Sequence, residues 1–233
     1  RWEAAVEAGD MEAAKKLGPQ TAEYTPQMVQ ETKEMLGLMG LTWVEAPMEA
    51  EGAAAVMCSR GDVAAVASQD WDTLLYGAPV MVRNLTSHGT RRFGRAIHAE
   101  RIVLSDMLEE HDITREQLVD VGIMVGTDFH PGIKGIGPKT GLKLIQKHGT
   151  MEAVAEARGF DLPEDLVAIR GLFMDHPVGE APLPGPEKAV EEGLRGFLQE
   201  ERGFSERRLD RALGRLSKAG RLRSASQPSI FDF

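Results

Sequence analysis

The stretch LTWVEAPMEAEGAAAVMCSRGDVAAVAS, residues 41–68, carries the pattern that decides the fold. Residues 41–46 and 62–68 are short apolar runs of strand length, and the alanine-rich residues 48–60 between them end at Gly61. A strand, a helix and a second strand form a βαβ unit, whose crossover places both strands parallel in one sheet. Residues 79–85 predict a third strand. We therefore predict an α/β fold built on a parallel sheet.

Helical patterns lie on both sides of this unit. Thr25 precedes Pro26, which is a capping residue followed by proline at the first helical position. Thr114 and Gln117 form the spacing of a capping box that opens a helix through residue 125. Further helices are predicted at 102–110, 163–176, 187–200 and 205–218, with a linker at 177–188. The last dozen or so residues have the composition of a flexible tail.

Composition and charge limit the class of protein. The chain has 233 residues, a net charge of -9 and one cysteine, Cys58, which excludes an internal disulfide framework and a cysteine-based zinc site. No apolar run reaches the length of a membrane span, so we expect no membrane partner. Acidity alone argues against nucleic acid, but a local basic surface can still bind phosphate. The chain begins at Arg1, without methionine and inside a helical pattern, so we expect a piece of a longer protein.

Two pairs of carboxylates follow the two predicted strands. Glu49 and Glu51 come after the first strand, and Asp70 and Asp72 after the second. Ligands of an open parallel sheet bind outside the carboxyl ends of its strands. In an extended segment Asp70 and Asp72 point the same way, whereas Glu49 and Glu51 converge only within the strand-to-helix turn or an irregular first helical turn. Four such carboxylates repel one another without cations, and oxygen ligands suit Mg²⁺ or Mn²⁺.

A purely structural interpretation of each pair stays open. Glutamate at the start of a helix interacts favourably with the helix dipole, and aspartate after a strand is a common turn residue. The agreement of the two pairs across consecutive turns favours a metal site. Asp128, in VGTDFHPG, is a fifth candidate, at a helix end where a turn residue is also expected.

The stretch GIKGIGPKTGLKLI, residues 132–145, points to a phosphate-containing ligand. Its glycines allow a tight turn, and the amides at the start of the following helix form an anion site. The candidate contacts are Lys134, Gly135, Gly137, Lys139, Lys143 and Lys147. A lysine stripe is commonly a solvated helix face, but beside a glycine hairpin it favours a clamp on the phosphate backbone. Residues 202–223 form a second basic region.

Four ordered motifs resemble those of the flap endonucleases, the archaeal and eukaryotic structure-specific 5′ nucleases. They are EMLGLMGLTWVEAPMEAEGAA (34–54), ASQDWDTLLYGAP (67–79), GIMVGTDFHPGIKGIGPK (122–139) and RGFSERRLDRALGRLSK (202–218). The resemblance implies a PIN-like parallel-sheet nuclease domain with the remnant of a helical arch, a helix-hairpin-helix element at 126–149 and C-terminal helices. The implied domains are 1–40 with the end of the arch and the next helix, 41–220 with the nuclease core, and 221–233 as a tail.

The same resemblance implies the cofactors and partners. The metal-binding and catalytic residues would be Glu49, Glu51, Asp70, Asp72 and Asp128, holding two Mg²⁺ or Mn²⁺ ions. Main-chain carbonyls of Gly132, Ile133 and Ile136 match the carbonyls that hold K⁺ in the family. The tail QPSIFDF resembles a sliding-clamp (PCNA) binding motif through Gln227, Ile230 and Phe233, but stops before the usual second aromatic residue.

The implied activity is that of a metal-dependent endonuclease and 5′–3′ exonuclease on branched DNA with a 5′ flap. Two-metal hydrolysis would serve Okazaki-fragment maturation and repair, in the archaeal cytoplasm or the eukaryotic nucleus. The family has an upstream segment with two more metal-binding aspartates, which this chain lacks, so we expect an incomplete metal cluster and absent or weakened activity. The alternatives are a related nuclease for bubble or gapped DNA, and a non-catalytic DNA-binding and clamp-tethering module.

Overall fold

The computed structural model describes residues 6–12, 25–87, 89–92, 94–178 and 187–223. The chain forms two compact units. The central unit is Glu45–Pro182, and the terminal unit combines Arg1–Val44 with Leu183–Phe233. Each unit is described separately below. No described helix is both long and apolar enough to cross a membrane.

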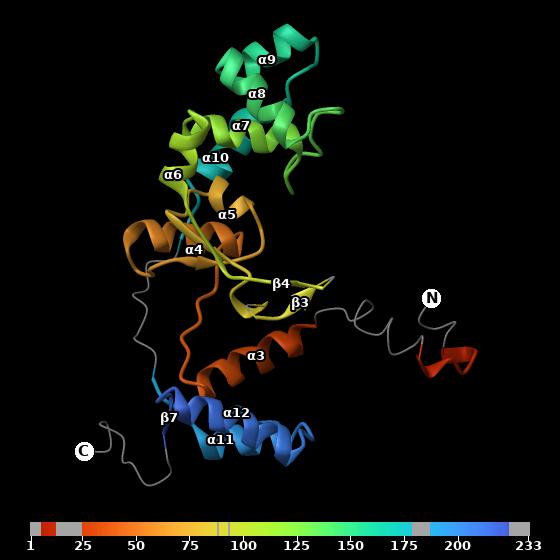
Figure 1. Ribbon diagram of the computed structural model, residues 1–233, viewed down its shortest axis with the longest axis vertical. Coiled ribbons are helices and arrows are strands. Elements are labelled where there is room, and N and C mark those ends of the chain that lie inside the picture. The colour runs from red at the N-terminus through yellow and green to blue at the C-terminus, as the bar shows by residue number, and fades with distance from the viewer. Residues whose placement is uncertain (1–5, 13–24, 88, 93, 179–186, 224–233) are drawn as a thin grey trace. The chain divides into compact units, whose positions relative to one another are not determined.

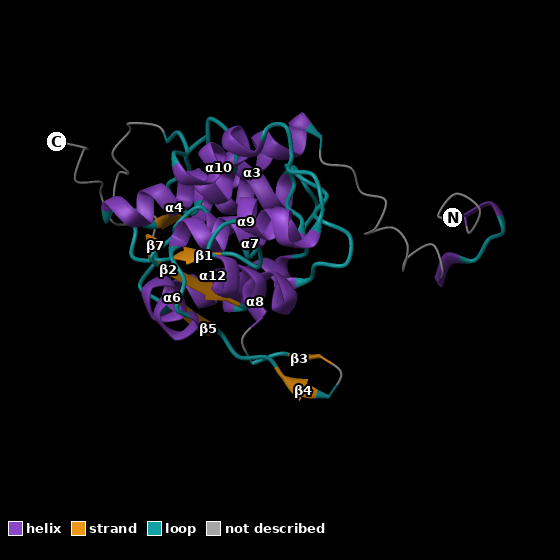
Figure 2. Cartoon of the chain, turned by 90° about the horizontal axis from the view of Figure 1, so that it is seen from above, coloured by secondary structure: helices purple, strands orange, loops and turns teal. Residues whose placement is uncertain are grey.

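The central unit contains a small mixed sheet (Figure 1). Strand β1 (Val66–Ala67) pairs parallel with β2 (Val80–Arg83), and β2 pairs antiparallel with β5 (Glu100–Val103). The α/β class is confirmed, and the sheet is mixed rather than parallel throughout because β5, a strand that was not predicted, pairs antiparallel with β2. The chain returns from β2 to β5 through a hairpin, β3 (Arg91–Arg92) and β4 (Arg95–Ala96), instead of a crossover helix, and so enters the sheet in the opposite direction. This hairpin extends away from the sheet (Figure 2).

The predicted strand at residues 41–46 is not formed, and no described strand pairs with this segment. Its large side chains, Leu41, Trp43 and Val44, are each about two-fifths exposed. A strand is held by hydrogen bonds to a neighbouring strand, and an apolar run by itself supplies none of them. The second predicted strand is shorter than expected for the same reason, because only Val66 and Ala67 have partners.

Seven helices are described in the central unit. They are α4 (Ala50–Arg60), α5 (Asp72–Leu75), α6 (Leu104–His111), α7 (Arg115–Val125), α8 (Pro138–His148), α9 (Met151–Arg158) and α10 (Leu166–Met174), with a 3-10 turn at Leu85–Ser87. The capping box of Thr114 and Gln117 is formed, and α4 ends at Gly61 in a left-handed conformation. Helices α5 and α9 and the β3–β4 hairpin were not predicted.

Helix α7 is the centre of the main hydrophobic core. Val119 and Ile123 are completely buried, together with Ile145 from α8 and Phe173 from α10. Helices α8, α9 and α10 gather around α7 on one side of the sheet (Figure 1). Complete burial of several large apolar side chains stabilises α7 strongly. The end of α7 therefore holds in place the start of the loop that follows it.

The terminal unit is helical. It contains α3 (Pro26–Leu38), α11 (Glu191–Arg195), a π-helical turn (Gly196–Glu200) and α12 (Glu206–Lys218), and β6 (Ala189–Val190) pairs parallel with β7 (Leu222–Arg223). Thr25 caps α3 as predicted, with its side chain accepting a hydrogen bond from the Met28 amide. The core of this unit is formed by Ala189, Leu194, Leu209 and Leu213. The unit therefore joins a helix of the first predicted domain to helices of the second.

Part of the C-terminal basic region packs inside the terminal unit. Arg202 lies 3.5 Å from the Phe197 ring centre and 3.4 Å from a Glu31 carboxylate oxygen. Arg221 donates a hydrogen bond to the carbonyl of Gly40. These two arginines therefore have structural partners, whereas Arg211 and Lys218 on α12 are exposed.

Candidate metal centre

The start of α4 carries the first pair of carboxylates. Glu49 is the N-cap residue, with extended backbone angles, and Glu51 lies in the first turn. The pair therefore lies where the chain turns into the helix. The sequence predicts that the two side chains can converge only in such a turn. Glu49 is exposed and Glu51 is partly buried. Both lie at the N-terminal end of the helix, where the helix dipole is positive.

The second pair lies at the start of α5, and its geometry differs from the expected extended segment. Asp72 is the first helical residue, and Trp71 before it has helical backbone angles. The Asp70 amide donates to the Ser68 hydroxyl at 3.1 Å, and Asp70 Oδ1 accepts from the Asp72 amide at 3.0 Å. A helical turn closed by the Asp70 side chain, rather than strand alternation, therefore brings these two carboxylates together.

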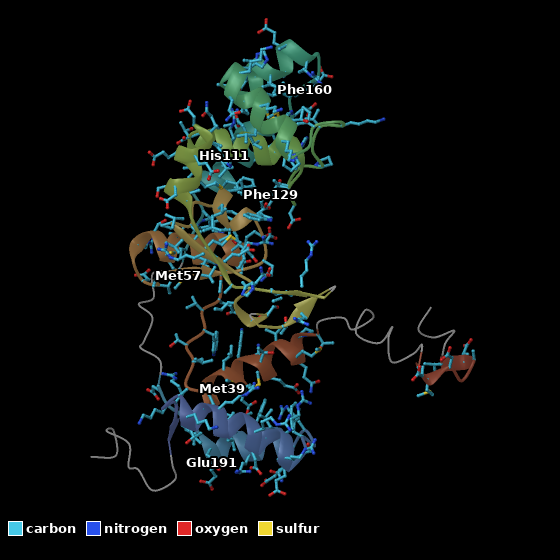
Figure 3. The ribbon with its side chains drawn as sticks, in the orientation of Figure 1. Met39, Met57, His111, Phe129, Phe160 and Glu191 are labelled. Carbon is cyan, nitrogen blue, oxygen red and sulfur yellow. The ribbon has the colours of Figure 1, made fainter. Side chains whose placement is uncertain are left out.

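All five predicted carboxylates line one pocket. Asp128 reaches it from the loop after α7, where Thr127 and His130 exchange backbone hydrogen bonds. The pocket, with a volume of about 20 Å³, is lined by Glu49, Glu51, Asp70, Asp72, Tyr76, Asp128 and Phe129. Tyr76 is buried and Phe129, labelled in Figure 3, is partly buried. Three separate chain segments thus supply acids to one small space beside two aromatic rings.

The electrostatics of this pocket are unfavourable to further negative charge. Burial raises the pKa of Asp72 to about 6, and the negative charges of Asp70, Asp128 and Glu51 raise it as well. Burial and the same group of carboxylates raise the pKa of the Tyr76 hydroxyl. Within the described residues, none of the five carboxylates forms an ion pair with lysine or arginine. Within the part of the chain that the structure describes, no ion pair therefore compensates the negative charge of these carboxylates.

The donor set fits divalent cations. Carboxylate oxygens are the ligands that Mg²⁺ and Mn²⁺ prefer. Burial and repulsion together raise the pKa of Asp72, and a cation relieves the repulsion. Among the described side chains, no three His, Cys, Asp or Glu residues stand close enough together to coordinate one ion. Carboxylates repel one another when no cation lies between them. We therefore expect the five side chains to move closer together in the pocket when a cation binds.

The glycine hairpin connects α7 to α8. Gly132 and Gly135 have φ values of +83° and +87°, which only glycine adopts readily. The Ile133 amide donates to the Met124 carbonyl at 2.7 Å, and the Ile133 carbonyl accepts from the Ile136 amide. The structure thus forms the predicted helix-hairpin-helix geometry. The K⁺ contacts assigned to Gly132, Ile133 and Ile136 stay a prediction.

The predicted DNA contacts are all exposed. They are Lys134, Gly135, Gly137, Lys139, Lys143 and Lys147. On α8, Gly141 and Ile145 are the buried residues, and the three lysines at four-residue spacing lie outside them. The basic stripe is therefore available to a partner, while its role stays a prediction.

Sequence reasoning missed two residues beneath the pocket. Arg115 donates hydrogen bonds to the carbonyls of Leu75, Tyr76 and Phe173, and so joins α5 to α10. His176 is buried, and its Nε2 is 3.1 Å from the carbonyl oxygen of Glu49. Arg115 lies within the capping-box stretch but is not one of its two bonding residues, and each of the two residues bonds to main-chain atoms of remote segments, so nothing in the sequence distinguished them.

Some predicted sites fall outside the described residues. The clamp contacts Gln227, Ile230 and Phe233 do, as do most of residues 1–20, which were assigned to the end of the arch.

Comparison with known proteins shows the family to which the chain that forms this pocket is similar. The model of the XPG I-region matches residues 40–128, a span that contains all five carboxylates. The Flap endonuclease 1 of Ignicoccus hospitalis is 39% identical over 242 residues, covering 100% of this chain and 68% of that protein. The chain belongs to the flap endonuclease family. The chain spans about two thirds of the length of this relative.

Solved structures agree with the family assignment. Flap endonuclease-1 from Methanococcus jannaschii superimposes with a TM-score of 0.71 at 36% identity, covering 92% of this chain and 64% of that one. The catalytic core of Rad2 in complex with DNA substrate gives a TM-score of 0.71 at 21% identity, covering 83% and 71%. At that identity the Rad2 likeness shows the fold alone. The PIN-like α/β nuclease fold implied by the sequence motifs is thereby confirmed.

Proposed function

We propose that this chain is the metal-binding and duplex-gripping part of a structure-specific nuclease that hydrolyses phosphodiester bonds in branched DNA with a 5′ flap. The observation that carries the proposal is the convergence of five carboxylates, from three chain segments, on one pocket. Membership of the flap endonuclease family supports the same reaction. The activity would be endonucleolytic at the base of the flap and 5′–3′ exonucleolytic at a free end.

The cofactors in this proposal are two Mg²⁺ ions, with Mn²⁺ as a substitute, held by Glu49, Glu51, Asp70, Asp72 and Asp128. A bound divalent cation of this kind lowers the pKa of a coordinated water and stabilises charge on a leaving oxygen. The chain supplies the geometry. Asp70 is oriented by the Asp72 amide, and the buried Tyr76 lines the pocket.

The proposed DNA grip is the glycine hairpin with α8. Exposed Lys139, Lys143 and Lys147 follow one another at four-residue intervals, which places three cations along one face of the helix. Such contacts hold the phosphate backbone and carry little sequence information, so they fit an enzyme that selects the shape of its substrate. A K⁺ ion on the carbonyls of Gly132, Ile133 and Ile136 would add positive charge there.

The remaining partners and the location belong to the same proposal. Gln227, Ile230 and Phe233 would bind a sliding clamp (PCNA), which would tether the enzyme to DNA during replication and repair. The relative from Ignicoccus hospitalis is archaeal, which favours the cytoplasm as the place of action.

Replacement of one carboxylate tests the proposal. Asp70→Asn in the full-length gene product should abolish Mg²⁺-dependent cleavage of a 5′-flap duplex. The matched control is Asp106→Asn, which makes the same change at an exposed aspartate in the first turn of α6, outside the pocket. Undiminished cutting by Asp70→Asn would contradict the metal site.

The substrate class needs a second comparison. Cleavage rates on flap, bubble, gapped and intact duplex DNA separate a flap nuclease from a nuclease for bubble or gapped DNA. A non-catalytic tethering module predicts instead DNA binding without cleavage in Mg²⁺, unchanged when all five carboxylates are replaced, and clamp binding lost on deletion of residues 227–233.

A further inference from the structure

His176 is a buried polar residue with no place in the chemistry described so far. It lies two residues beyond the end of α10 and is 6% exposed. Its ring nitrogens face two main-chain carbonyls. Nε2 is 3.1 Å from the oxygen of Glu49, and Nδ1 is 3.4 Å from the oxygen of Leu172. We assign the ring proton to Nε2 because that contact is the shorter one.

Neighbouring residues fix the position of this ring. Tyr76 packs edge-on against it, with ring centres 4.9 Å apart. Gly52, in the first turns of α4, leaves the space that the ring occupies, since a Cβ atom at Gly52 would lie 2.6 Å from three ring atoms. The ring is thus enclosed between α4 and the aromatic residue at the base of the pocket.

The start of α4 has no side-chain cap. Glu49 occupies the N-cap position and makes no side-chain capping hydrogen bond. Glutamate is not one of the favoured N-cap residues, and an uncapped first turn frays readily. The Glu49 carbonyl accepts the first helical bond from the Ala53 amide, and the His176 contact adds a second donor to the same oxygen.

We propose that His176 is a positioning residue for the metal centre. Its Nε2–H donates to the Glu49 carbonyl and holds the uncapped first turn of α4, which carries the carboxylates of both Glu49 and Glu51. The link to metal binding rests on the proposed function, whereas the link to the order of α4 does not. The hydrogen bond acts on backbone and leaves every carboxylate oxygen of the pair available to a cation.

Two variants separate the hydrogen bond from ring packing. His176→Phe keeps an aromatic ring against Tyr76 and Gly52 and removes the donor. His176→Gln keeps a donor on a side chain of similar reach. Phe173→Leu is the control for a general loss of packing. Phe173 packs on Tyr76 with ring centres 4.9 Å apart and lies in α10, just before His176, but its side chain makes no bond to Glu49.

The first measurement is the dissociation constant of Mn²⁺ from the whole chain. Binding is detected by electron paramagnetic resonance, at a temperature below the unfolding temperature of every variant. His176→Phe should weaken binding by about tenfold, the lower end of the range for residues that orient metal ligands. His176→Gln should recover most of the affinity, and Phe173→Leu should bind as the wild type does. Unchanged binding by His176→Phe, or equal loss in His176→Gln, would overturn the proposal.

The second measurement is hydrogen–deuterium exchange at residues 50–54 in EDTA, which needs no metal. Exchange there should rise in His176→Phe and stay near the wild-type rate in His176→Gln. If the wild type binds no Mn²⁺, the proposed metal site fails, and the exchange result alone decides the positioning role. Equal exchange in wild type and His176→Phe would overturn that role.

Discussion

Asp70 Oδ1 accepts a hydrogen bond from the backbone amide of Asp72 at 3.0 Å, so the first carboxylate of the pair fixes the helical turn that presents the second. Asp72 then lies partly buried among like charges, and the pKa of its carboxyl is raised to about 6. Placing Asp72 there destabilises the folded state when no metal is bound. A bound cation would reduce this destabilisation, which explains why the chain places the carboxylates together.

Asp72→Asn should therefore stabilise the chain in EDTA. The raised pKa means that the folded state binds the Asp72 proton more tightly than the unfolded state, whose value is 3.8. The cost is full above pH 6 and disappears as the pH falls below the unfolded value. After discounting for solvent screening of a half-exposed group, we expect a gain of about 1 kcal/mol near neutral pH. Urea unfolding of both proteins measures it.

Saturating Mg²⁺ supplies the control for this prediction. Ligands that bind only the folded state stabilise it, so the metal should raise the stability of the wild type more than that of the variant. A variant that is less stable than the wild type in EDTA would contradict the repulsion.

Arg170 contacts two carboxylates, one buried and one largely exposed. Removal of the buried carboxylate should lower the free energy of unfolding more than removal of the exposed one. It bonds Asp120, whose side chain is 6% exposed, at 2.7 Å, and Glu152, which is 47% exposed, at 2.6 Å. Asp120 also accepts from the Met151 amide. Asp120→Ala should lower the free energy of unfolding by about 3 kcal/mol and Glu152→Ala by less than about 1 kcal/mol. Equal effects in urea titrations would be inconsistent with this geometry.

Glu152 should also make stability depend on acid pH. The hydrogen bond from Arg170 lowers the pKa of Glu152 from 4.5 to about 2, more than its partial burial raises it. A lowered pKa means that the stabilisation is complete above pH 4.5 and is lost as the pH falls through about 2. The stability difference between wild type and Glu152→Gln should accordingly shrink across that window. A difference independent of pH would refute the prediction.

Gly132 and Gly135 form a matched pair within the hairpin. Both have positive φ, but a Cβ at Gly132 would lie 2.5 Å from the Val125 carbonyl oxygen, and one at Gly135 meets nothing within 4 Å. Gly135→Ala should cost about 1 to 2 kcal/mol, from the left-handed conformation alone. Gly132→Ala should cost more and should also weaken duplex DNA binding. The comparison needs unfolding curves and a binding titration of both variants.

The lysines of α8 should contribute to DNA affinity through salt-dependent phosphate contacts. Each of Lys139→Ala, Lys143→Ala and Lys147→Ala should lower the slope of log affinity against log salt by about 1, on every DNA sequence alike. Arg158→Ala, an exposed cation in the last turn of α9, is the control and should leave the slope unchanged. Binding is measured in Ca²⁺ so that no cleavage interferes.

Local features could be predicted from sequence where local chemistry decides them. The capping box at Thr114, the cap of α3 at Thr25 and the end of α4 at Gly61 were all found, because neighbouring residues determine each one. The strand at residues 41–46 was predicted wrongly and strand β5 was not predicted, since both depend on which segments pair. Helix α5 was missed because four residues show no periodicity.

The sequence by itself indicated five candidate metal ligands and grouped four of them into two pairs. Spacing within a pair is a local property, and the repeat of Glu49 and Glu51 by Asp70 and Asp72 is visible in the letters. Only the tertiary structure decided that Asp128 joins them, that Asp72 is the carboxylate with the raised pKa, and that His176 touches Glu49 across 127 positions of chain. Burial and distance between remote segments set those relations, and neither quantity can be calculated from neighbouring residues alone.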